Sequence, residues 1–121
     1  IIAVLNKIKP PYNVNELTQK KALKRLLKMD EVKSEIKKIL KERSRLVEQL
    51  EEVSFIKKTY STDANFVLVK VDDANKRYNQ LIEKGIVIRN RTTQPLCENT
   101  LRLTVGTKKE TKLLIKALKE I

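Results

Sequence analysis

The sequence lacks histidine altogether and has a single cysteine, Cys97. A lone cysteine excludes a disulfide within the chain, and without histidine the usual activator of a catalytic thiol and the usual partner in a zinc site are both missing. We therefore expect Cys97 to be a loop or core thiol with no chemical role, and we expect no metal centre. So few cysteines are typical of a reducing cytoplasm, which is the location that we expect.

Glycine and aromatic residues are also scarce, with two glycines in the chain and an aromatic content of 4%. Two glycines cannot build a glycine-rich phosphate loop, and so few rings leave little for stacking against single-stranded nucleic acid. No apolar run approaches the roughly 18 residues that a membrane-spanning helix needs. We expect neither a loop of that kind nor a membrane partner.

Charge is what the sequence has in abundance, and its sign is mostly positive. Lys and Arg total 27, Asp and Glu total 15, and the formal net charge is +12. This balance invites a nucleic-acid interpretation. The acidic residues are nevertheless spread among the basic ones, and no segment is a purely basic arm. We expect no nucleic-acid partner and keep a basic nucleic-acid-binding module as the less favoured alternative.

The length of 121 residues and the apolar content of 40% suit one folded domain with a modest core. Because the sequence starts with isoleucine rather than methionine, we expect it to be a piece of a longer protein. Residues 1–9 predict the end of a helix, which Pro10 and Pro11 stop because proline lacks an N–H group. Asn13 and Glu16 then have the spacing of an N-cap and the third residue of the next helix. The apolar face of that helix is predicted to carry Leu17, Leu23, Leu26 and Leu27.

A longer helix is predicted over about residues 30–53, where apolar residues recur at alternating steps of four and three. The pattern fits two structures. One is a short coiled coil, which would act as a scaffold or an oligomerisation element. The other, which we favour, is a helix that spans the junction between two domains.

After residue 53 the pattern changes to the order β-β-α-β-β-α. Strands are predicted at residues 55–60, 65–71, 86–91 and 101–105. One helix starts from a cap at Asp72 or Asp73 and ends at Gly85; the last starts at Thr107, where Glu110 completes a capping box. Its inward face is predicted to carry Leu113, Leu114, Ala117, Leu118 and Ile121. Helices packed on one face of a small, mostly antiparallel sheet define an α+β fold.

Arg102 stands out because it interrupts an apolar strand. Side chains alternate between the two faces of a strand, so the leucines on either side of Arg102 belong to the core face and Arg102 to the other. From alternation alone, a surface arginine is the simpler interpretation. If this strand pairs with the strand that carries Arg89 and Arg91, several guanidinium groups meet there, and each can bind a carboxylate or phosphate through two parallel hydrogen bonds. The residues themselves thus suggest an anion site and indicate no catalytic residue.

Four segments of the sequence resemble a known family. NFVLVKV, GIVIRNR and NTLRLTVGTKKET are similar to the C-terminal part of the fold type I pyridoxal-phosphate aminotransferases, and KIKPPYNVN resembles the loop by which that family leaves its large domain. The order of elements agrees along the whole chain, and the closest resemblance is to the histidinol-phosphate aminotransferases. The resemblance implies a helical connection over residues 1–54 and a C-terminal small domain over residues 55–121.

The resemblance also implies a role for Arg102. In the family, the arginine of the corresponding strand binds the substrate's carboxylate or an equivalent anionic group, and that position here is Arg102. Arg89 matches a second arginine near the anionic end of the substrate, and Tyr12 is implied to line the active site at most. A two-point clamp on the substrate helps to hold the reacting C–H bond perpendicular to the cofactor ring.

The implied reaction transfers an amino group between histidinol phosphate and 2-oxoglutarate or glutamate, with pyridoxal phosphate as cofactor, in a homodimer. An aromatic aminotransferase and a threonine-phosphate decarboxylase are the alternatives within the same fold. The family's Schiff-base lysine is implied to lie upstream of Ile1. We therefore expect no catalytic and no cofactor-binding residue in this chain, which alone should bind no cofactor and be inactive.

Overall fold

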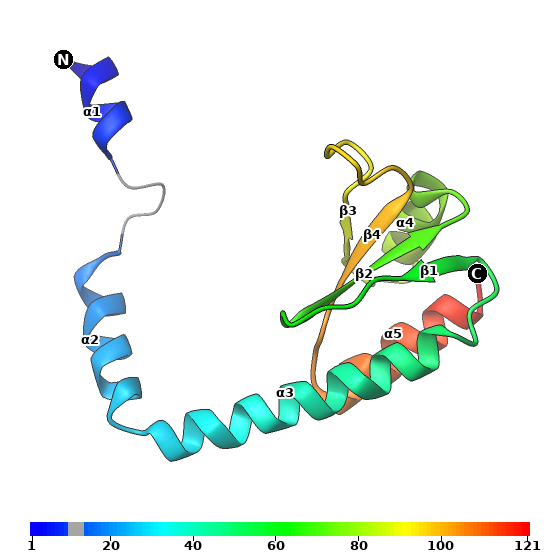
Figure 1. Cartoon of the computed structure of the whole chain (residues 1–121), viewed down its shortest axis with the longest axis horizontal. Coiled ribbons are helices and arrows are strands. Elements are labelled where there is room, and N and C mark those ends of the chain that lie inside the picture. The colour runs from blue at the N-terminus through cyan, green and yellow to red at the C-terminus, as the bar shows by residue number, and fades with distance from the viewer. Residues whose placement is uncertain (10–13) are drawn as a thin grey trace. The chain divides into compact units, whose positions relative to one another are not determined.

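The structure is a computed structural model that describes residues 1–9 and 14–121 (Figure 1). The predicted helix stop at Pro10 and Pro11, the predicted cap Asn13 and the predicted lining residue Tyr12 lie outside the described residues. The chain divides into two compact units, Ile1–Ser34 and Glu35–Ile121.

The first unit is helical. It contains α1 (Ile2–Ile8), α2 (Glu16–Leu26) and the start of α3 (Met29–Leu50). α2 begins directly after Asn15, whose side-chain oxygen accepts a hydrogen bond from the N–H group of Thr18 at 2.9 Å. The predicted place of Glu16 as the third residue of this helix was therefore wrong. Glu16 is the first residue of the helix rather than the third, because the side chain of Asn15 reaches one of the free N–H groups of the first turn.

The remainder of α3 belongs to the second unit, and its last turns enter a hydrophobic core. Leu46 and Leu50 are fully buried there, and Val53 just beyond the helix is buried, whereas Ile36 and Ile39 are exposed. The apolar residues of the heptad-like pattern are thus exposed at Ile36 and Ile39 and buried at Leu46 and Leu50. Its C-terminal half packs in the core of the sheet unit.

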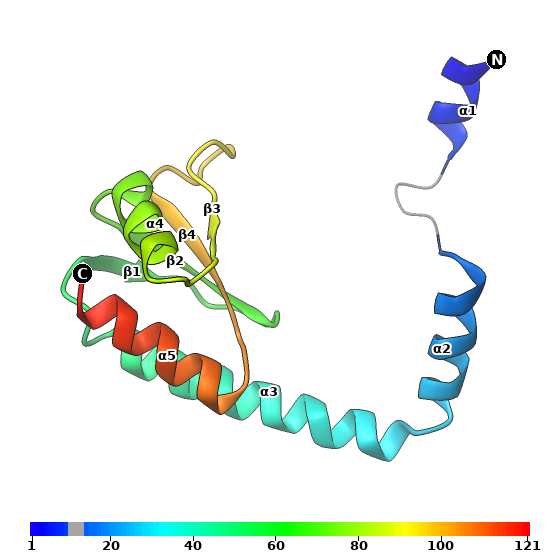
Figure 2. The ribbon, with the colours of Figure 1, turned by 180° about the vertical axis from the view of Figure 1, so that it is seen from behind.

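The second unit is built on a four-stranded antiparallel sheet in the order β1-β2-β4-β3 (Figure 2). The strands are β1 (Ile56–Thr59), β2 (Phe66–Val71), β3 (Arg89–Asn90) and β4 (Thr100–Thr104), and the helices after β2 and β4 are α4 (Ala74–Glu83) and α5 (Lys108–Lys119).

The core lies on one face of this sheet. Val67 pairs with Leu103 and Val69 pairs with Leu101, which brings four buried side chains of the central strands to the same face. The core continues with buried side chains of the helices, among them Leu50 of α3, Leu81 of α4 and Leu118 of α5. The predicted α+β fold and the order of its elements are confirmed.

The strand predicted over residues 86–91 is shorter in the structure. Gly85 has a φ of +74°, which glycine adopts without strain. Its N–H group donates to the carbonyl of Ile82 at 2.8 Å, and the N–H group of Ile86 donates to the carbonyl of Leu81 at 2.8 Å. These bonds complete the end of α4 and use the N–H group of Ile86 outside the sheet. Only Arg89 and Asn90 remain to form β3.

α5 begins with the predicted capping box. The Thr107 hydroxyl accepts from the N–H group of Glu110 at 3.4 Å, and the Glu110 carboxylate accepts from the N–H group of Thr107 at 2.7 Å. The inward face differs from the prediction, because Leu113 is 50% exposed while Thr111 and Ile115 are buried. The prediction for Leu113 was wrong because the series with helical spacing that meets the sheet starts at Thr111.

Candidate anion-binding site

The candidate site is formed by arginines on β3 and β4. Arg89 and Arg102 are direct partners in the antiparallel register. Residues that face each other across an antiparallel pair share a sheet face, and side chains alternate along β4. Both arginines therefore lie on the face opposite that of the fully buried Leu101 and Leu103. The pairing on which the anion-site prediction depends is thus observed.

Apolar side chains surround Arg102 on this face. Its direct partner on β2 is Leu68, and its guanidinium carbon lies 5.0 Å from the centroid of the Phe66 ring. The ring holds the guanidinium plane through its negative face. The Nε atom of Arg102 is buried and has no hydrogen-bond partner within the described part of the chain. A buried donor without a partner costs about 1–3 kcal/mol, and an oxygen atom of a ligand would relieve that cost.

A third arginine lies beside this pair. The N–H group of Arg91 donates to the carbonyl of Thr100 at 2.9 Å, which continues the β3–β4 pairing by one residue. Burial lowers the pKa of Arg102 from its ordinary value, and the positive charges of Arg91 and then Arg89 lower that pKa further. Among the residues that the structure describes, no carboxylate forms an ion pair with any of these three arginines. The face therefore concentrates positive charge that no carboxylate of the described chain neutralises.

This arrangement is suited to binding and not to bond-making. Guanidinium groups stay protonated, so they donate hydrogen bonds and stabilise negative charge but do not act as bases. Their planar forks match the oxygen atoms of a carboxylate or a phosphate. The site can therefore hold and orient the anionic end of a small molecule.

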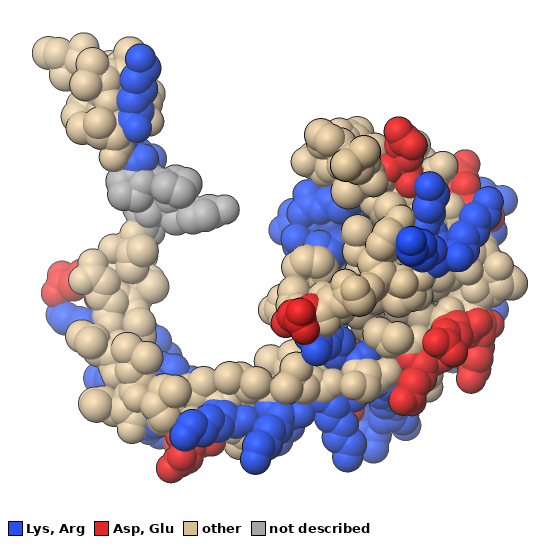
Figure 3. Space-filling model, in the orientation of Figure 1, with Lys and Arg blue, Asp and Glu red and all other residues tan. Residues whose placement is uncertain are grey.

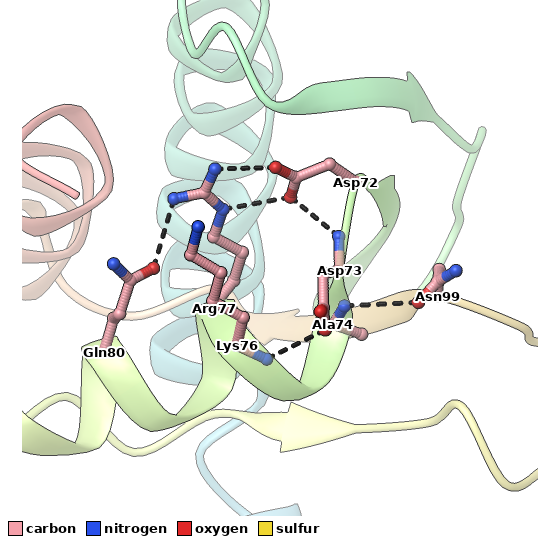
Figure 4. Close-up of polar contacts among 7 residues, drawn as sticks. All are labelled: Asp72, Asp73, Ala74, Lys76, Arg77, Gln80 and Asn99. Atoms are coloured by element: carbon pink, nitrogen blue, oxygen red, sulfur yellow. Dashed lines mark hydrogen bonds and ion pairs between the residues drawn. The ribbon is translucent and has the colours of Figure 1, made fainter.

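Arg77 is a further arginine, which the sequence did not single out, and Figure 4 shows its polar contacts. Unlike Arg102, it pairs with a carboxylate. Its Nε atom donates to one carboxylate oxygen of Asp72 at 2.9 Å, and a terminal nitrogen donates to the other at 2.6 Å. It also donates to Gln80 at 3.1 Å, and its guanidinium lies 4.1 Å from the ring centroid of Phe55. The hydrogen bonds from Arg77 lower the pKa of Asp72 to about 2, and Asp72 raises the pKa of Arg77. Arg77 is thus a satisfied structural group.

The neighbouring residues Asp72 and Asp73 have different structural roles. Asp73 is the N-cap of α4, since its side chain accepts from the N–H group of Lys76 at 2.9 Å, while Asp72 pairs with Arg77 (Figure 4). The sequence predicted a cap at one of the two positions, which is confirmed for Asp73. Asp72 pairs with Arg77, which lies five residues later, beyond the junction between β2 and α4. No periodic pattern in the sequence predicts a pair at that spacing.

Asn99 fixes the start of the strand that carries Arg102. Its side-chain oxygen accepts from the N–H group of Ala74 at 3.3 Å (Figure 4). Its backbone carbonyl accepts from the N–H group of Val71 at 2.9 Å. Its φ is +53°, a conformation that asparagine tolerates better than most residues. The loop before β4 is thereby joined both to β2 and to the first turn of α4.

The other candidates from the sequence contribute nothing further to the described site. Cys97 is a free, half-buried thiol in the loop before β4. Residues 1–9 and 14–121 contain no group of three or more His, Cys, Asp or Glu side chains that could hold a metal ion. Over the same residues, no helix combines the length and the apolar character needed to cross a membrane.

The fold and the arginine-bearing strand pair agree with a comparison of the sequence with protein families. Residues 1–118 match the family aminotransferase class I and II, and the chain belongs to this family. The histidinol-phosphate aminotransferase of Flavobacterium johnsoniae is 66% identical over 119 residues, which are 98% of this chain and 34% of that relative. The chain thus spans about a third of the length of the curated relatives that it matches.

Solved structures give the same family. The histidinol-phosphate aminotransferase of Clostridium acetobutylicum superposes with a TM-score of 0.82 at 29% identity, over 98% of this chain and 36% of that one. A decarboxylase from Sulfurospirillum multivorans superposes with a TM-score of 0.76 at 25% identity, over 99% of this chain and 32% of that one. The family inferred from the sequence motifs is confirmed. Because the two structures are named for different reactions, the shared arrangement of elements does not by itself define the reaction.

Proposed function

We propose that this chain is part of a histidinol-phosphate aminotransferase and supplies the substrate-anion site of that enzyme. The observation that carries the proposal is the meeting of Arg89 and Arg102 on one sheet face, where the described residues offer them no carboxylate. The substrate pair is histidinol phosphate with 2-oxoglutarate. The support for histidinol phosphate is that relatives at 66% and 63% identity, from Flavobacterium johnsoniae and Christiangramia forsetii, are both named histidinol-phosphate aminotransferase.

In this proposal Arg102 is the principal clamp. Its fork donates two parallel hydrogen bonds to the anionic end of the substrate, and the contact with Phe66 limits the rotation of the fork. Arg89, directly opposite, donates to the same anion from the neighbouring strand. A substrate held at two points loses rotational freedom before the reaction, so its reacting carbon is kept in line with the cofactor.

The cofactor of the proposed enzyme is pyridoxal phosphate, which supplies the electron sink for breaking the substrate's C–H bond. The described sheet face carries the guanidinium groups, apolar neighbours, Lys70 and the hydroxyl groups of Thr100 and Thr104, without a carboxylate to pair with the cofactor's ring nitrogen. We therefore place the cofactor's own contacts, including its lysine, in other parts of the protein. This chain then contributes substrate binding and no catalytic group. Tyr12 keeps its proposed place as a lining residue at most.

The division of the chain is a further part of the proposal. Residues 1–54 form the connection to the rest of the enzyme, and residues 55–121 form its small domain. Exposed apolar side chains of α2 support this, since Leu17 and Leu26 are 78% and 62% exposed and need other polypeptide to cover them. The complete enzyme is proposed to be a cytoplasmic homodimer.

A second candidate is another pyridoxal-phosphate enzyme of the same fold, such as an aromatic aminotransferase or a threonine-phosphate decarboxylase. The similarity to the Sulfurospirillum multivorans decarboxylase favours keeping it. A nucleic-acid-binding module has less support, because acidic side chains lie among the basic ones on the face shown in Figure 3. Such a module requires a continuous basic surface for the phosphate backbone.

The experiment uses the full-length protein that contains this sequence, purified and examined by visible absorption. We expect a cofactor band that changes when either histidinol phosphate or glutamate is added. Histidinol, which lacks the phosphate, is the matched control and should act only at much higher concentration. A band that responds to glutamate and ignores histidinol phosphate would discard the substrate, and the lack of any cofactor band would discard the enzyme. Retention of mixed-sequence DNA at low salt would support the module instead.

A further inference from the structure

We propose that Arg91 is a third ligand of this anion site and the residue by which the site prefers a phosphate dianion to a carboxylate. The inference rests on the proposed function and deepens it, because it assigns a charge preference to the same site. Arg91 sits two residues after Arg89, so the two side chains share a face of the extended chain.

The backbone of Arg91 is held on both sides. Its N–H group donates to the carbonyl of Thr100 at 2.9 Å, and its carbonyl accepts from the N–H group of Gln94 at 2.9 Å. The next N–H group, that of Thr92, donates to the side chain of Asn90 at 2.9 Å. Arg91 therefore starts from a fixed point beside β4, two residues along that strand from Arg102, and is not a loop residue free to move away.

The charge of Arg91 affects the pKa of Arg102. Of the two neighbouring arginines, Arg91 has the larger effect on the pKa of Arg102, larger than Arg89, its direct partner in the sheet. Arg91 is half-buried while Arg89 is exposed, so water screens the charge of Arg91 less. Arg91 is thus the closer electrostatic partner of Arg102 although it lies outside the paired strand.

Three guanidinium groups are more than a carboxylate uses. A carboxylate has one negative charge and two oxygen atoms, which a single bidentate arginine satisfies. A phosphate monoester carries a charge of about −1.5 to −2 at pH 7 and offers three acceptor oxygen atoms. Two arginines already balance that charge, and a third adds donors for the oxygen lone pairs that the two leave unpaired. Removing the third should therefore weaken the binding of a dianion and hardly affect that of a monoanion.

The experiment measures binding to the full-length protein by calorimetry, with methyl phosphate and acetate as probes. For Arg91→Gln we expect methyl phosphate to bind about fivefold to twentyfold more weakly, the lower part of the range for a charge-assisted contact, because Arg91 is not fully buried. Acetate should change less than twofold. In Arg91→Lys, which keeps the charge and loses the planar fork, part of the loss should be recovered.

Lys112→Gln is the matched control. It removes one positive charge from an exposed position on α5, the helix that packs on the opposite face of the sheet. We expect it to leave both affinities unchanged. An equal loss in Lys112→Gln, or an equal loss for both probes in Arg91→Gln, would overturn the proposal, because general charge or damaged folding would then explain the result.

The pH dependence of phosphate affinity distinguishes a specific role of Arg91 from a general loss of folding. A phosphate monoester gains its second charge near pH 6, so its affinity for the unaltered protein should rise between about pH 5 and pH 7.5. This rise should be flatter in Arg91→Gln, whereas an identical rise in both proteins would contradict a dianion-specific role. If the protein fails to transaminate histidinol phosphate while these binding results hold, the proposed function falls and the role of Arg91 stands. If transamination holds and the binding results fail, only Arg91 is misassigned.

Discussion

Arg89 and Arg102 lie directly opposite each other on adjacent antiparallel strands and carry the same charge. Like charges at directly opposite positions destabilise a sheet. Here the conflict is increased by Arg91, and the described residues supply no carboxylate to offset it. A local conflict of this kind inside an otherwise consistent fold is expected at functional positions. An anionic ligand that settles between the arginines removes it.

The first prediction is that Arg102→Met stabilises the protein while it weakens anion binding. Methionine keeps an apolar stem against Phe66 and removes both a repelled charge and a buried donor without a partner. We expect the free energy of unfolding to rise by about 1 kcal/mol in phosphate-free buffer. Urea unfolding followed by circular dichroism measures it. Added phosphate should stabilise the unaltered protein and not the variant, and a less stable variant in phosphate-free buffer would refute the repulsion argument.

The second prediction concerns acid stability and the pair of Asp72 and Arg77. The pKa of Asp72 falls from 3.8 to about 2 on folding, so its stabilising effect is complete above its unfolded pKa and is lost as the pH falls towards 2. The Asp72 side chain is 35% exposed. We therefore reduce the effect for solvent screening and expect Asp72→Asn to lose about 1–2 kcal/mol at pH 7.

The measurement is urea unfolding of both proteins at several values between pH 7 and pH 2. The two stability curves should converge as the pH falls from about 4 towards 2, because a protonated Asp72 resembles asparagine in charge. Asp63→Asn, at an exposed carboxylate, is the control and should run parallel to the unaltered protein. Parallel curves for Asp72→Asn as well would show that the ion pair does not contribute.

The third prediction tests the start of α5. A Cβ atom at Gly106 would lie 2.9 Å from the Cβ atom and 2.9 Å from the carboxylate oxygen of Glu110. Gly106→Ala should therefore push the Glu110 side chain away from the N–H group of Thr107 and cost about 1 kcal/mol, the usual value of a lost cap. The control is the same substitution in a Glu110→Gly background, which removes both of the contacted atoms, and there it should cost much less. Equal costs in both backgrounds would show that the loss of stability does not come from the capping box.

Much of the fold could be read from the sequence because the periodic signals are strong. The helical series in α3, the alternation in β4 and the capping box at Thr107 indicated the element types and their order. The prediction failed at boundaries where a neighbouring element competes for the same backbone groups. The N–H group of Ile86 completes the end of α4, so the predicted strand lost its first residues.

The candidate site could be predicted only in part. Alternation placed Arg102 on the face away from the core, which is a local property of one strand. The position of Arg89 opposite Arg102 depends on the register between two strands, and the loop of residues 92–99 that sets this register follows no periodic rule. The closeness of Arg91 depends in addition on its hydrogen bond to Thr100 just beyond β3. These relations required the structure.

The assignment of Arg102 is decided by the steady-state kinetics of Arg102→Lys in the full-length protein with histidinol phosphate. Lysine keeps the charge but cannot form the planar fork, so kcat/KM should fall tenfold to a hundredfold, corresponding to about 1.5–3 kcal/mol. Arg45→Lys on α3, whose ion pair with Glu42 is long at 4.0 Å, serves as the control and should keep its activity. A kcat/KM of Arg102→Lys close to that of the unaltered enzyme would contradict the assignment of Arg102 as the substrate clamp.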